Sequence, residues 1–369
     1  MKESDYTLAD TGNLISPALI YYRDIILANT RRVIEMAGGA DRLWPHVKSH
    51  KAREMIRLQI EQGITRFKCA TVAEAEMTAA AGAAHVILAY PLIGPNISRY
   101  LRLAGAYPQT VFYAIGDDYD QLSAVSSAAL RMGIRLKTLI DVDMGMHRTG
   151  VALNALESLY ERASALEGLS LEGLHCYDGH LHDKDFFRRK KDVDEIDQRV
   201  LGIREAILKK GLNCGLLVFG GTPTFPCRAG QEGIFLSPGT AFIGDWGYYC
   251  SLPDIAFTPG AALFTRVVSH PAKNAFTLDL GYKGIASDPA GGRGIIVGME
   301  DARPLFQSEE HWVFSKPEGR ELLPIGSPCY VLPTHICPTS ALYPEILVAR
   351  QGRITETWQV SARNRRITY

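Results

Sequence analysis

Short apolar segments alternate with amphipathic segments through the first two thirds of the chain. The segments between the apolar ones repeat apolar residues at helical spacing, as Leu156, Leu159 and Ala163 do. Eight such alternations predict an α/β fold, a (β/α)8 TIM-like barrel; a doubly wound open sheet is the alternative with the same pattern. The apolar segments have the length of buried strands. They are Leu43–Val47, Arg66–Cys69, Val86–Ala89, Thr110–Tyr113, Leu136–Asp141, Leu171–Cys176, Leu216–Phe219 and Gly233–Leu236.

The helical pattern ends near Tyr249, and short alternating segments broken by glycine and proline follow it. Such alternation is typical of strands with one buried face. The sequence therefore predicts two domains: a barrel of residues 23–249, and a C-terminal all-β domain of residues 250–369 that an N-terminal strand in residues 1–22 joins. The predicted strands of the second domain are Phe264–His270, Ala275–Leu280, Gly294–Val297, Cys329–Pro333, Glu345–Arg350 and Arg353–Gln359.

The composition is that of an ordinary globular protein and argues against two classes of partner. The chain has 46% hydrophobic and 22% charged residues, with 40 basic against 40 acidic side chains. That balance provides no net positive field to attract nucleic acid, and no apolar run approaches the length of a membrane span. The N-terminus lacks the apolar core of a signal peptide, which predicts a cytoplasmic protein. Seven cysteines without paired spacing predict thiols rather than a disulfide framework.

Lys48 directly follows the first predicted strand, in the segment Trp44-Pro45-His46-Val47-Lys48-Ser49-His50-Lys51. In parallel barrels the carboxyl ends of the strands carry the catalytic groups. A lysine held there, partly shielded and near a second cation, can have its amine pKa lowered enough to form a Schiff base. The alternative is that Lys48 and Lys51 are surface charges ahead of a helix.

Two glycine-rich loops follow the seventh and eighth predicted strands. They are Gly220-Gly221-Thr222-Pro223-Thr224 and Ser237-Pro238-Gly239-Thr240. Phosphate sites in barrels are commonly built from these two loops, because glycine leaves the backbone N–H groups accessible to the anion. Each loop alone could be a tight turn. Together with a lysine after the first strand, they predict a pyridoxal phosphate site, since that cofactor needs both a lysine and a phosphate cradle.

Further candidate groups lie after the fifth and sixth strands and in the second domain. Arg148 follows the fifth strand, where a guanidinium suits a phenolate or carboxylate partner. Tyr177 ends the sixth strand and begins a run that contains two histidines. His335 and Cys337 would share one face of an extended segment and could supply two Zn²⁺ ligands. The alternative for this pair is a packed histidine beside a buried cysteine.

These motifs resemble those of the metal-activated, pyridoxal-phosphate-dependent D-threonine aldolases and D-serine dehydratases of the alanine racemase-like fold. The resemblance extends over most of the chain, from Ser16-Pro17-Ala18-Leu19 to Val360-Ser361-Ala362-Arg363. It implies that Lys48 binds the cofactor and is also the base at the substrate Cα, with Arg148 beside the cofactor and Tyr177 near its ring. It further implies a phosphate cradle composed of Gly220, Gly221, Thr222, Gly239 and Thr240.

The segment His335-Ile336-Cys337-Pro338-Thr339 resembles the metal motif of this family. The resemblance implies that His335 and Cys337 bind a divalent metal and that His335 is among the catalytic residues. Some aldolases of the family carry HxD at this place, whereas the dehydratases carry HxC. A thiolate favours Zn²⁺, and a carboxylate suits Mn²⁺ better. Trp44 departs from the family, in which an arginine often precedes the Pro-His pair.

The resemblance implies a lyase that acts on a small β-hydroxy D-amino acid, and a homodimer. We expect retro-aldol cleavage of the D-threonine type, to glycine and acetaldehyde, because the chain length and the segment Trp358–Arg363 are more similar to the aldolases. Elimination to a keto acid and ammonia, as in D-serine or 3-hydroxy-D-aspartate dehydratases, is the alternative. A non-catalytic pyridoxal phosphate carrier and a racemase are further alternatives, but a carrier needs neither a second domain nor a metal pair.

Overall fold

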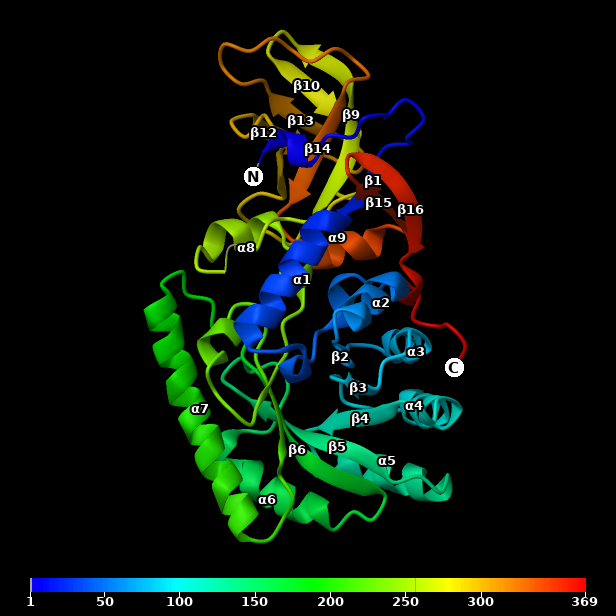
Figure 1. The fold of residues 1–369 in the computed structure, drawn as a ribbon, viewed down its shortest axis with the longest axis vertical. Helices are drawn as coiled ribbons and strands as arrows, with labels where there is room; N and C mark the ends of the chain where they lie inside the picture. The colour runs from blue at the N-terminus through cyan, green and yellow to red at the C-terminus, as the bar shows by residue number, and fades with distance from the viewer. Residues whose placement is uncertain (1, 256) are drawn as a thin grey trace. The chain divides into compact units, whose positions relative to one another are not determined.

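The computed structural model describes residues 2–255 and 257–369. The chain forms two compact units (Figure 1): one contains Arg32–Gly239 with Ser361–Tyr369, and the other contains Met1–Arg31 with Thr240–Val360. The sequence prediction instead drew its domain boundaries after residues 22 and 249. None of the helices in the described residues combines the length and the apolar character that a membrane crossing requires. The seven cysteines are all thiols.

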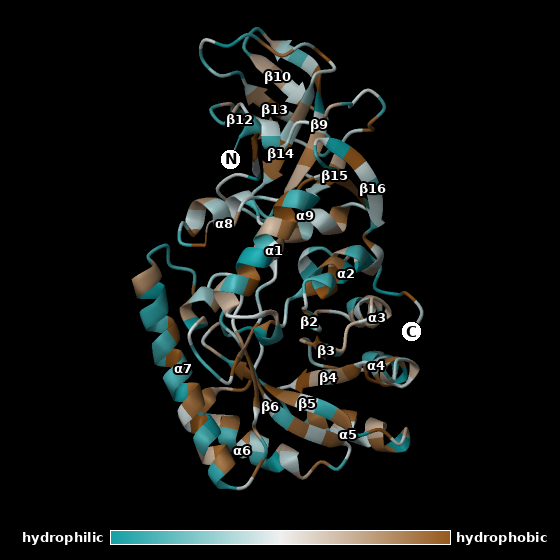
Figure 2. Cartoon of the chain, in the orientation of Figure 1, coloured by the Kyte–Doolittle hydropathy of each residue, from teal (hydrophilic) through white to brown (hydrophobic). Residues whose placement is uncertain are grey.

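The first unit contains a sheet of seven parallel strands, which pair in chain order. Figure 2 shows that β4 is largely hydrophobic. Buried side chains fill the interior, and one cluster consists of Trp44, Ile87, Tyr113, Ile115, Leu139 and Val218. The strands are β2 (Arg66–Cys69), β3 (His85–Leu88), β4 (Val111–Gly116), β5 (Leu136–Asp143), β6 (Leu169–Tyr177), β7 (Leu216–Phe219) and β8 (Phe235–Leu236).

The predicted first strand of the barrel, 43–47, is not a strand. Leu43 forms an isolated bridge with Leu236 of β8, and His46 forms one with Lys68 of β2. A 3-10 helix, η3 (Val47–Ser49), begins before a ladder can extend. The two bridges still place this segment between the last and the first strand of the sheet, at the eighth position of a barrel. The predicted (β/α)8 class is therefore confirmed, with one strand reduced to two bridges.

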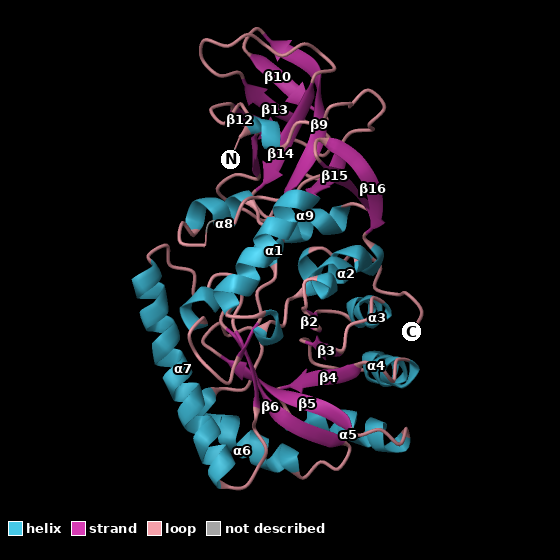
Figure 3. Ribbon diagram, viewed as in Figure 1, coloured by secondary structure: helices cyan, strands magenta, loops and turns pink. Residues whose placement is uncertain are grey.

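Helices alternate with these strands, as Figure 3 shows. The sequence Thr71-Val72-Ala73-Glu74 has the Thr-x-x-Glu pattern that predicts a helix N-cap at Thr71. The Oγ1 atom of Thr71 accepts a hydrogen bond from the N–H of Glu74 at 3.1 Å, so Thr71 is the N-cap of α3 (Val72–Ala80). The helices of the barrel are α2 (Arg53–Glu61), α3 (Val72–Ala80), α4 (Pro95–Ala106), α5 (Tyr119–Arg131), α6 (Leu153–Ser164) and α7 (Phe186–Lys209).

The second unit is mostly β, with a sheet in the order β12-β13-β10-β9-β1-β15-β16, and β14 pairs with both β9 and β11. The N-terminal strand β1 (Ala18–Tyr22) lies between β9 and β15. The prediction of an all-β domain is wrong in one respect, because the unit also contains α8 (Trp246–Ser251) and α9 (Ile336–Leu342), and α1 (Arg23–Ala37) begins in it. The other strands are β9 (Ala261–Ala272), β10 (Ala275–Leu278), β11 (Gly294–Ile296), β12 (Arg303–Gln307), β13 (Trp312–Ser315), β14 (Pro328–Pro333), β15 (Glu345–Arg350) and β16 (Arg353–Gln359).

Candidate active site

Lys48 lies in η3, directly after the bridge at His46. The N–H of Lys48 donates to His46 Nδ1 at 3.3 Å, and the N–H of Lys51 donates to the carbonyl of Val47 at 3.0 Å. Lys51 has a φ of +52°, in the left-handed region, and its ammonium pairs with the buried carboxylate of Glu74. These contacts fix the turn that carries Lys48, which distinguishes it from a charge on a mobile surface segment.

The side chain of Tyr177, at the end of β6, has three cations around it. Lys48 Nζ lies 5.7 Å from the ring centroid, Lys68 Nζ lies 5.6 Å from it and Arg148 Cζ lies 4.8 Å from it. Attraction to the ring favours each cation, but positive charges this close repel one another, and burial together with this repulsion lowers the pKa of Lys68. The arrangement therefore suits a ligand with several negative charges beside the ring. The structure thus brings together three of the predicted cofactor residues, Lys48, Arg148 and Tyr177.

The two glycine-rich loops contact each other beyond β7 and β8. The N–H of Gly239 donates to Thr222 Oγ1 at 3.2 Å. Gly220 has a φ of +73°, and a Cβ atom at Gly221 would lie 3.0 Å from Tyr177 Cε2. Glycine at position 221 therefore leaves room for the tyrosine ring. The predicted phosphate loop and the predicted aromatic residue belong to one packed arrangement.

A buried ion-pair network supports these loops. Arg228 donates to Asp197 from Nε at 2.6 Å and from Nη2 at 2.7 Å, and its Nη2 also pairs with Asp178 at 2.7 Å. Asp178 follows Tyr177 in the chain, and it accepts a hydrogen bond from Thr224 Oγ1 at 2.7 Å. The network joins the end of β6 to the loop after β7, so it positions both the ring and the glycine loop.

Lys68, on β2, also lies beside Tyr177 and was not among the predicted site residues. Its side chain is buried, and its Nζ lies 3.4 Å from His175 Nε2, while His175 Nδ1 lies 2.7 Å from Asp141 Oδ1. Burial and then the charge of Lys48 lower the pKa of Lys68 to about 7. The sequence does contain an indication of this lysine. Strands of a parallel barrel are buried on both faces, so a lysine within the short predicted strand Arg66–Cys69 is expected to be buried.

His335 and Cys337 contact each other in the second unit, but not in the extended conformation that was predicted. His335 is the N-cap residue of α9, and Cys337 lies in its first turn. The helix forms because Pro338 is tolerated in a first turn and because the N–H of Ile336 donates to a carboxylate oxygen of Asp245 at 3.2 Å. The helical turn, rather than strand alternation, places the thiol within hydrogen-bond reach of the imidazole.

Asp288 is a further residue that the sequence analysis missed, and it orients His335. The Nδ1 atom of His335 lies 2.5 Å from Asp288 Oδ2, so Nδ1 carries the hydrogen in the neutral imidazole, and Nε2 is the atom that a metal would bind in place of a proton. Burial disfavours the charged imidazole, but Cys337 and Asp288 outweigh burial and raise the pKa of His335 to about 9. Thr240, a predicted cofactor residue, lies in the same unit, with its Oγ1 3.1 Å from Cys337 Sγ.

The metal site would depend on few protein ligands. Among residues 2–255 and 257–369, no group of three or more histidine, cysteine, aspartate or glutamate side chains is arranged to hold a metal ion. His335 and Cys337 are then two ligands at most, and water or substrate would have to complete the coordination shell. A shell of that kind is open, as in catalytic rather than structural metal sites.

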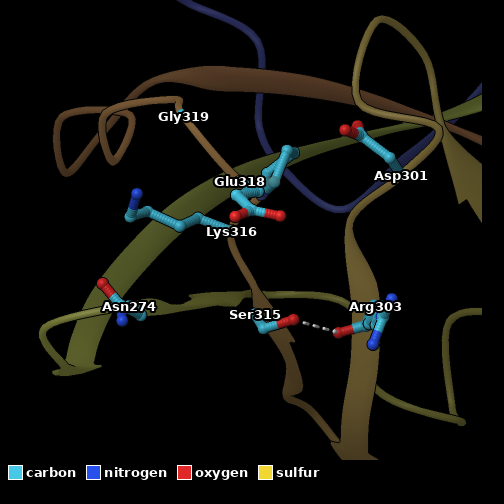
Figure 4. A pocket seen from close by; sticks show the side chains of 8 residues that line it. Asn274, Asp301, Arg303, Ser315, Lys316, Glu318 and Gly319 are labelled. Atoms are coloured by element: carbon cyan, nitrogen blue, oxygen red, sulfur yellow. Dashed lines mark hydrogen bonds between the residues drawn. The ribbon is translucent and has the colours of Figure 1, made fainter.

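A pocket of about 530 Å³ lies in the second unit and contains none of the predicted site residues (Figure 4). Arg303 and Lys316 contribute positive charge to its lining, and Asp301 and Glu318 contribute negative charge. The side chain of Ser315 donates to the carbonyl of Arg303 at 3.5 Å. The mixed charges select neither an anion nor a cation, so the pocket does not suggest a ligand of its own.

Comparison with known proteins places this arrangement in a family. Residues 23–245 match the model of the alanine racemase N-terminal domain, and residues 260–349 match a putative serine dehydratase domain. The D-threonine aldolase of Arthrobacter sp is 28% identical over 361 residues, which cover 94% of this chain and 92% of that protein. The D-threo-3-hydroxyaspartate dehydratase of Delftia sp. is 22% identical over 378 residues, which cover 94% of this chain and 97% of that protein.

A solved structure has the same fold over nearly the whole chain. The D-threonine aldolase of Filomicrobium marinum superposes with a TM-score of 0.85 at 25% sequence identity and covers 95% of each chain. The fold agreement therefore includes both the barrel and the second domain. The chain belongs to the alanine racemase family of barrels and carries a serine dehydratase-type second domain, which confirms the family that the sequence motifs predicted.

Proposed function

We propose that the chain is a pyridoxal-phosphate-dependent, divalent-metal-activated lyase that cleaves a β-hydroxy D-amino acid by a retro-aldol reaction. The observation that carries the proposal is the group of three cations around Tyr177, one of which is Lys48, beside two glycine-rich loops. The similarity to D-threonine aldolases over the whole chain supports the aldolase reaction and a substrate of the D-threonine type.

The residues present fit pyridoxal phosphate in charge and in shape. Lys48 would hold the cofactor, Arg148 would face an anionic oxygen and Tyr177 would lie against the ring. The cofactor supplies an electron-poor ring that accepts charge from a bond at the substrate Cα. Phosphate would bind the two loops that the Gly239–Thr222 hydrogen bond joins, which contain the remaining predicted residues Gly220, Gly221, Thr222, Gly239 and Thr240.

The donor set at His335 and Cys337 fits a divalent metal. A thiol and an imidazole oriented by Asp288 favour Zn²⁺, although an imidazole also suits Mn²⁺. A metal held there would supply a Lewis acid that lowers the pKa of the substrate β-hydroxyl, and loss of the hydroxyl proton favours cleavage of the Cα–Cβ bond. Lys48 would in turn move the proton at the substrate Cα, a role that its fixed turn permits.

Elimination of the β-hydroxyl is the second candidate function. Cys337 favours it, since the dehydratases of this family carry HxC, and the Delftia dehydratase is among the relatives. Elimination differs from cleavage in the bond that breaks, Cβ–O instead of Cα–Cβ. Both reactions use the same lysine and the same metal pair, so the products decide between them.

Product analysis tests the proposal. The purified protein with pyridoxal phosphate is given D-threonine and D-serine, each with and without a chelator. We expect glycine and acetaldehyde from D-threonine, and their loss with the chelator. Ammonia and a keto acid would establish the dehydratase instead, and no product from either substrate would overturn both. Borohydride reduction should label Lys48, and label on Lys51 or Lys283 would contradict the assignment of the cofactor lysine.

A further inference from the structure

Lys68 is a buried lysine to which the proposed reaction assigns no role. Its side chain is 2% exposed, and a buried lysine is rare unless an opposite charge pairs with it. Within residues 2–255 and 257–369, no carboxylate lies within ion-pair distance of its amine; the hydrogen-bond partner of the amine is the imidazole of His175, at 3.4 Å. An amine held in this way costs stability, so its position beside the Tyr177 ring calls for a functional explanation.

The direction of the hydrogen bonds around Lys68 follows from simple chemistry. An ionised carboxylate can only accept, so the hydrogen between His175 and Asp141 belongs to His175 Nδ1, at 2.7 Å from Asp141 Oδ1. The Nε2 atom of His175 is then an acceptor and faces Lys68. Burial lowers the pKa of His175, which keeps this imidazole neutral. Asp141, His175 and Lys68 form an ordered chain from a buried carboxylate to an amine beside Tyr177.

The surroundings of Lys68 balance its two protonation states. Burial and the charge of Lys48 disfavour the ammonium form, and Asp141 and Asp178 favour it. The result is a pKa of about 7 for Lys68, against an ordinary value of 10.5. The charged and titratable groups that face Lys68 lie in η3 and at its N-cap, in β5 and β6, and in the segments after these two strands. They are His46, Lys48, Asp141, Arg148, His175, Tyr177 and Asp178.

We propose that Lys68 is the proton acceptor for the substrate amine in the active site. The inference rests on the proposed function. A substrate amino acid arrives as an ammonium ion, and its nitrogen must lose a proton before it can react with the cofactor that Lys48 would hold. Neutral Lys68 takes that proton, so that Lys68 becomes an ammonium and the substrate amine becomes neutral. Lys68 gives a proton back to the amine of the departing product. Only N–H bonds form and break, and the site has the same charge at the end of the cycle.

The residue type matters in this role. Glutamine at position 68 would keep an N–H donor for His175 but could not carry a proton, and methionine would keep the volume without either property. Lys137 provides a matched control, since it also lies near a tyrosine ring on the same sheet, 5.9 Å from Tyr113, but it is 41% exposed and is paired with Glu172. The control lysine is outside the proposed machinery.

The first measurement does not depend on turnover. In protein with ¹³C-labelled lysine Cε atoms, one resonance should titrate near pH 7 and should be absent from Lys68→Gln and Lys68→Met but present in Lys137→Gln. Titration of Lys68 near its ordinary pKa would overturn the inference. Circular dichroism confirms that each variant is folded, and methionine serves where glutamine destabilises the barrel.

The second measurement follows the proton during binding. At pH 8 a group with a pKa near 7 is almost fully neutral at equilibrium, so an indicator dye should report the same net proton release when D-threonine binds the wild-type holoenzyme and Lys68→Gln, but in a stopped-flow experiment the release should be on the order of 100-fold slower for Lys68→Gln. We also expect kcat/KM of the variant to fall on the order of 100-fold and to lose its dependence on a group with a pKa near 7. Equal rates of proton release by both proteins would refute this role of Lys68. Failure of the proposed function is seen separately, as the absence of product from the wild type.

Discussion

Replacement of Lys68 by methionine should make the cofactor-free protein more stable near neutral pH. The pKa of Lys68 falls from 10.5 to about 7 on folding. At about 1.36 kcal/mol for each pKa unit, this is a cost of about 5 kcal/mol for the charged form. Methionine removes that cost but leaves His175 Nε2 without its donor, which costs about 1–3 kcal/mol. The expected net gain in the free energy of unfolding is therefore about 2–4 kcal/mol below pH 7.

The pH dependence gives the sign of the effect. Between pH 7 and 10.5 the unfolded chain holds a proton on Lys68 that the folded chain has lost, so the stability of the wild type rises with pH through this window. Below pH 7 both states are protonated and the full cost remains. Lys68→Met lacks this group, so its advantage should be largest at pH 6 and should shrink steadily toward pH 10.

A second lysine, which is partly buried, makes a control with the opposite expectation. Lys51 forms an ion pair with Glu74, whose side chain is fully buried. Lys51→Met leaves an uncompensated buried carboxylate, which costs about 3–5 kcal/mol. Urea unfolding of the wild type and both variants at pH 6, 8 and 10 measures the two effects. If Lys68→Met destabilises the protein at every pH, as Lys51→Met should, then Lys68 is a structural partner of the buried carboxylates and the reasoning fails.

Three further substitutions test other parts of the site. Arg228→Met should lower the free energy of unfolding by about 3–5 kcal/mol in urea titrations, because two buried carboxylates lose their partner; full stability would contradict the network. Asp288→Asn should weaken metal binding about 10- to 100-fold in calorimetric titrations, because His335 loses its orienting carboxylate, and excess metal should restore activity. Gly221→Val should displace the ring of Tyr177 and lower cofactor affinity, measured by absorbance titration, whereas unchanged affinity would remove this loop from the site.

The barrel was predictable because its strands are short and buried on both faces. Continuous apolar segments located β2 to β8 to within a few residues, and Thr71 marked the start of α3. The sequence did not predict β12 (Arg303–Gln307) or β13 (Trp312–Ser315). The side chains of β12 are mostly exposed and its second residue is Pro304, so this edge strand has no buried face to produce alternation. Strand β12 is defined by its backbone pairing with β13, and a hydropathy pattern does not contain that information.

Site residues could be proposed from the sequence where one residue type determines the chemistry. Lys48 and the HxC motif were proposed because an amine, a thiol and an imidazole are recognisable in the sequence itself. Their partners could not be proposed, because Asp288 and His335 are separated by 47 positions and meet only through the fold. The conformation of the HxC segment was also beyond the sequence pattern, since Asp245, far away in the chain, accepts the first N–H of α9.

Lys68 shows why a functional residue can contradict a local rule. In a hydropathy pattern, a lysine inside an apolar segment argues against a buried strand. The energetics point the same way, because burial disfavours the charged amine, lowers its pKa and reduces the stability of the fold. A structure with no use for this amine would gain stability by replacing it. The chain instead surrounds it with Lys48, Asp141 and His175, which keep both protonation states accessible near neutral pH. A residue that costs folding energy and is still held in one defined position is better explained by its chemistry than by its packing.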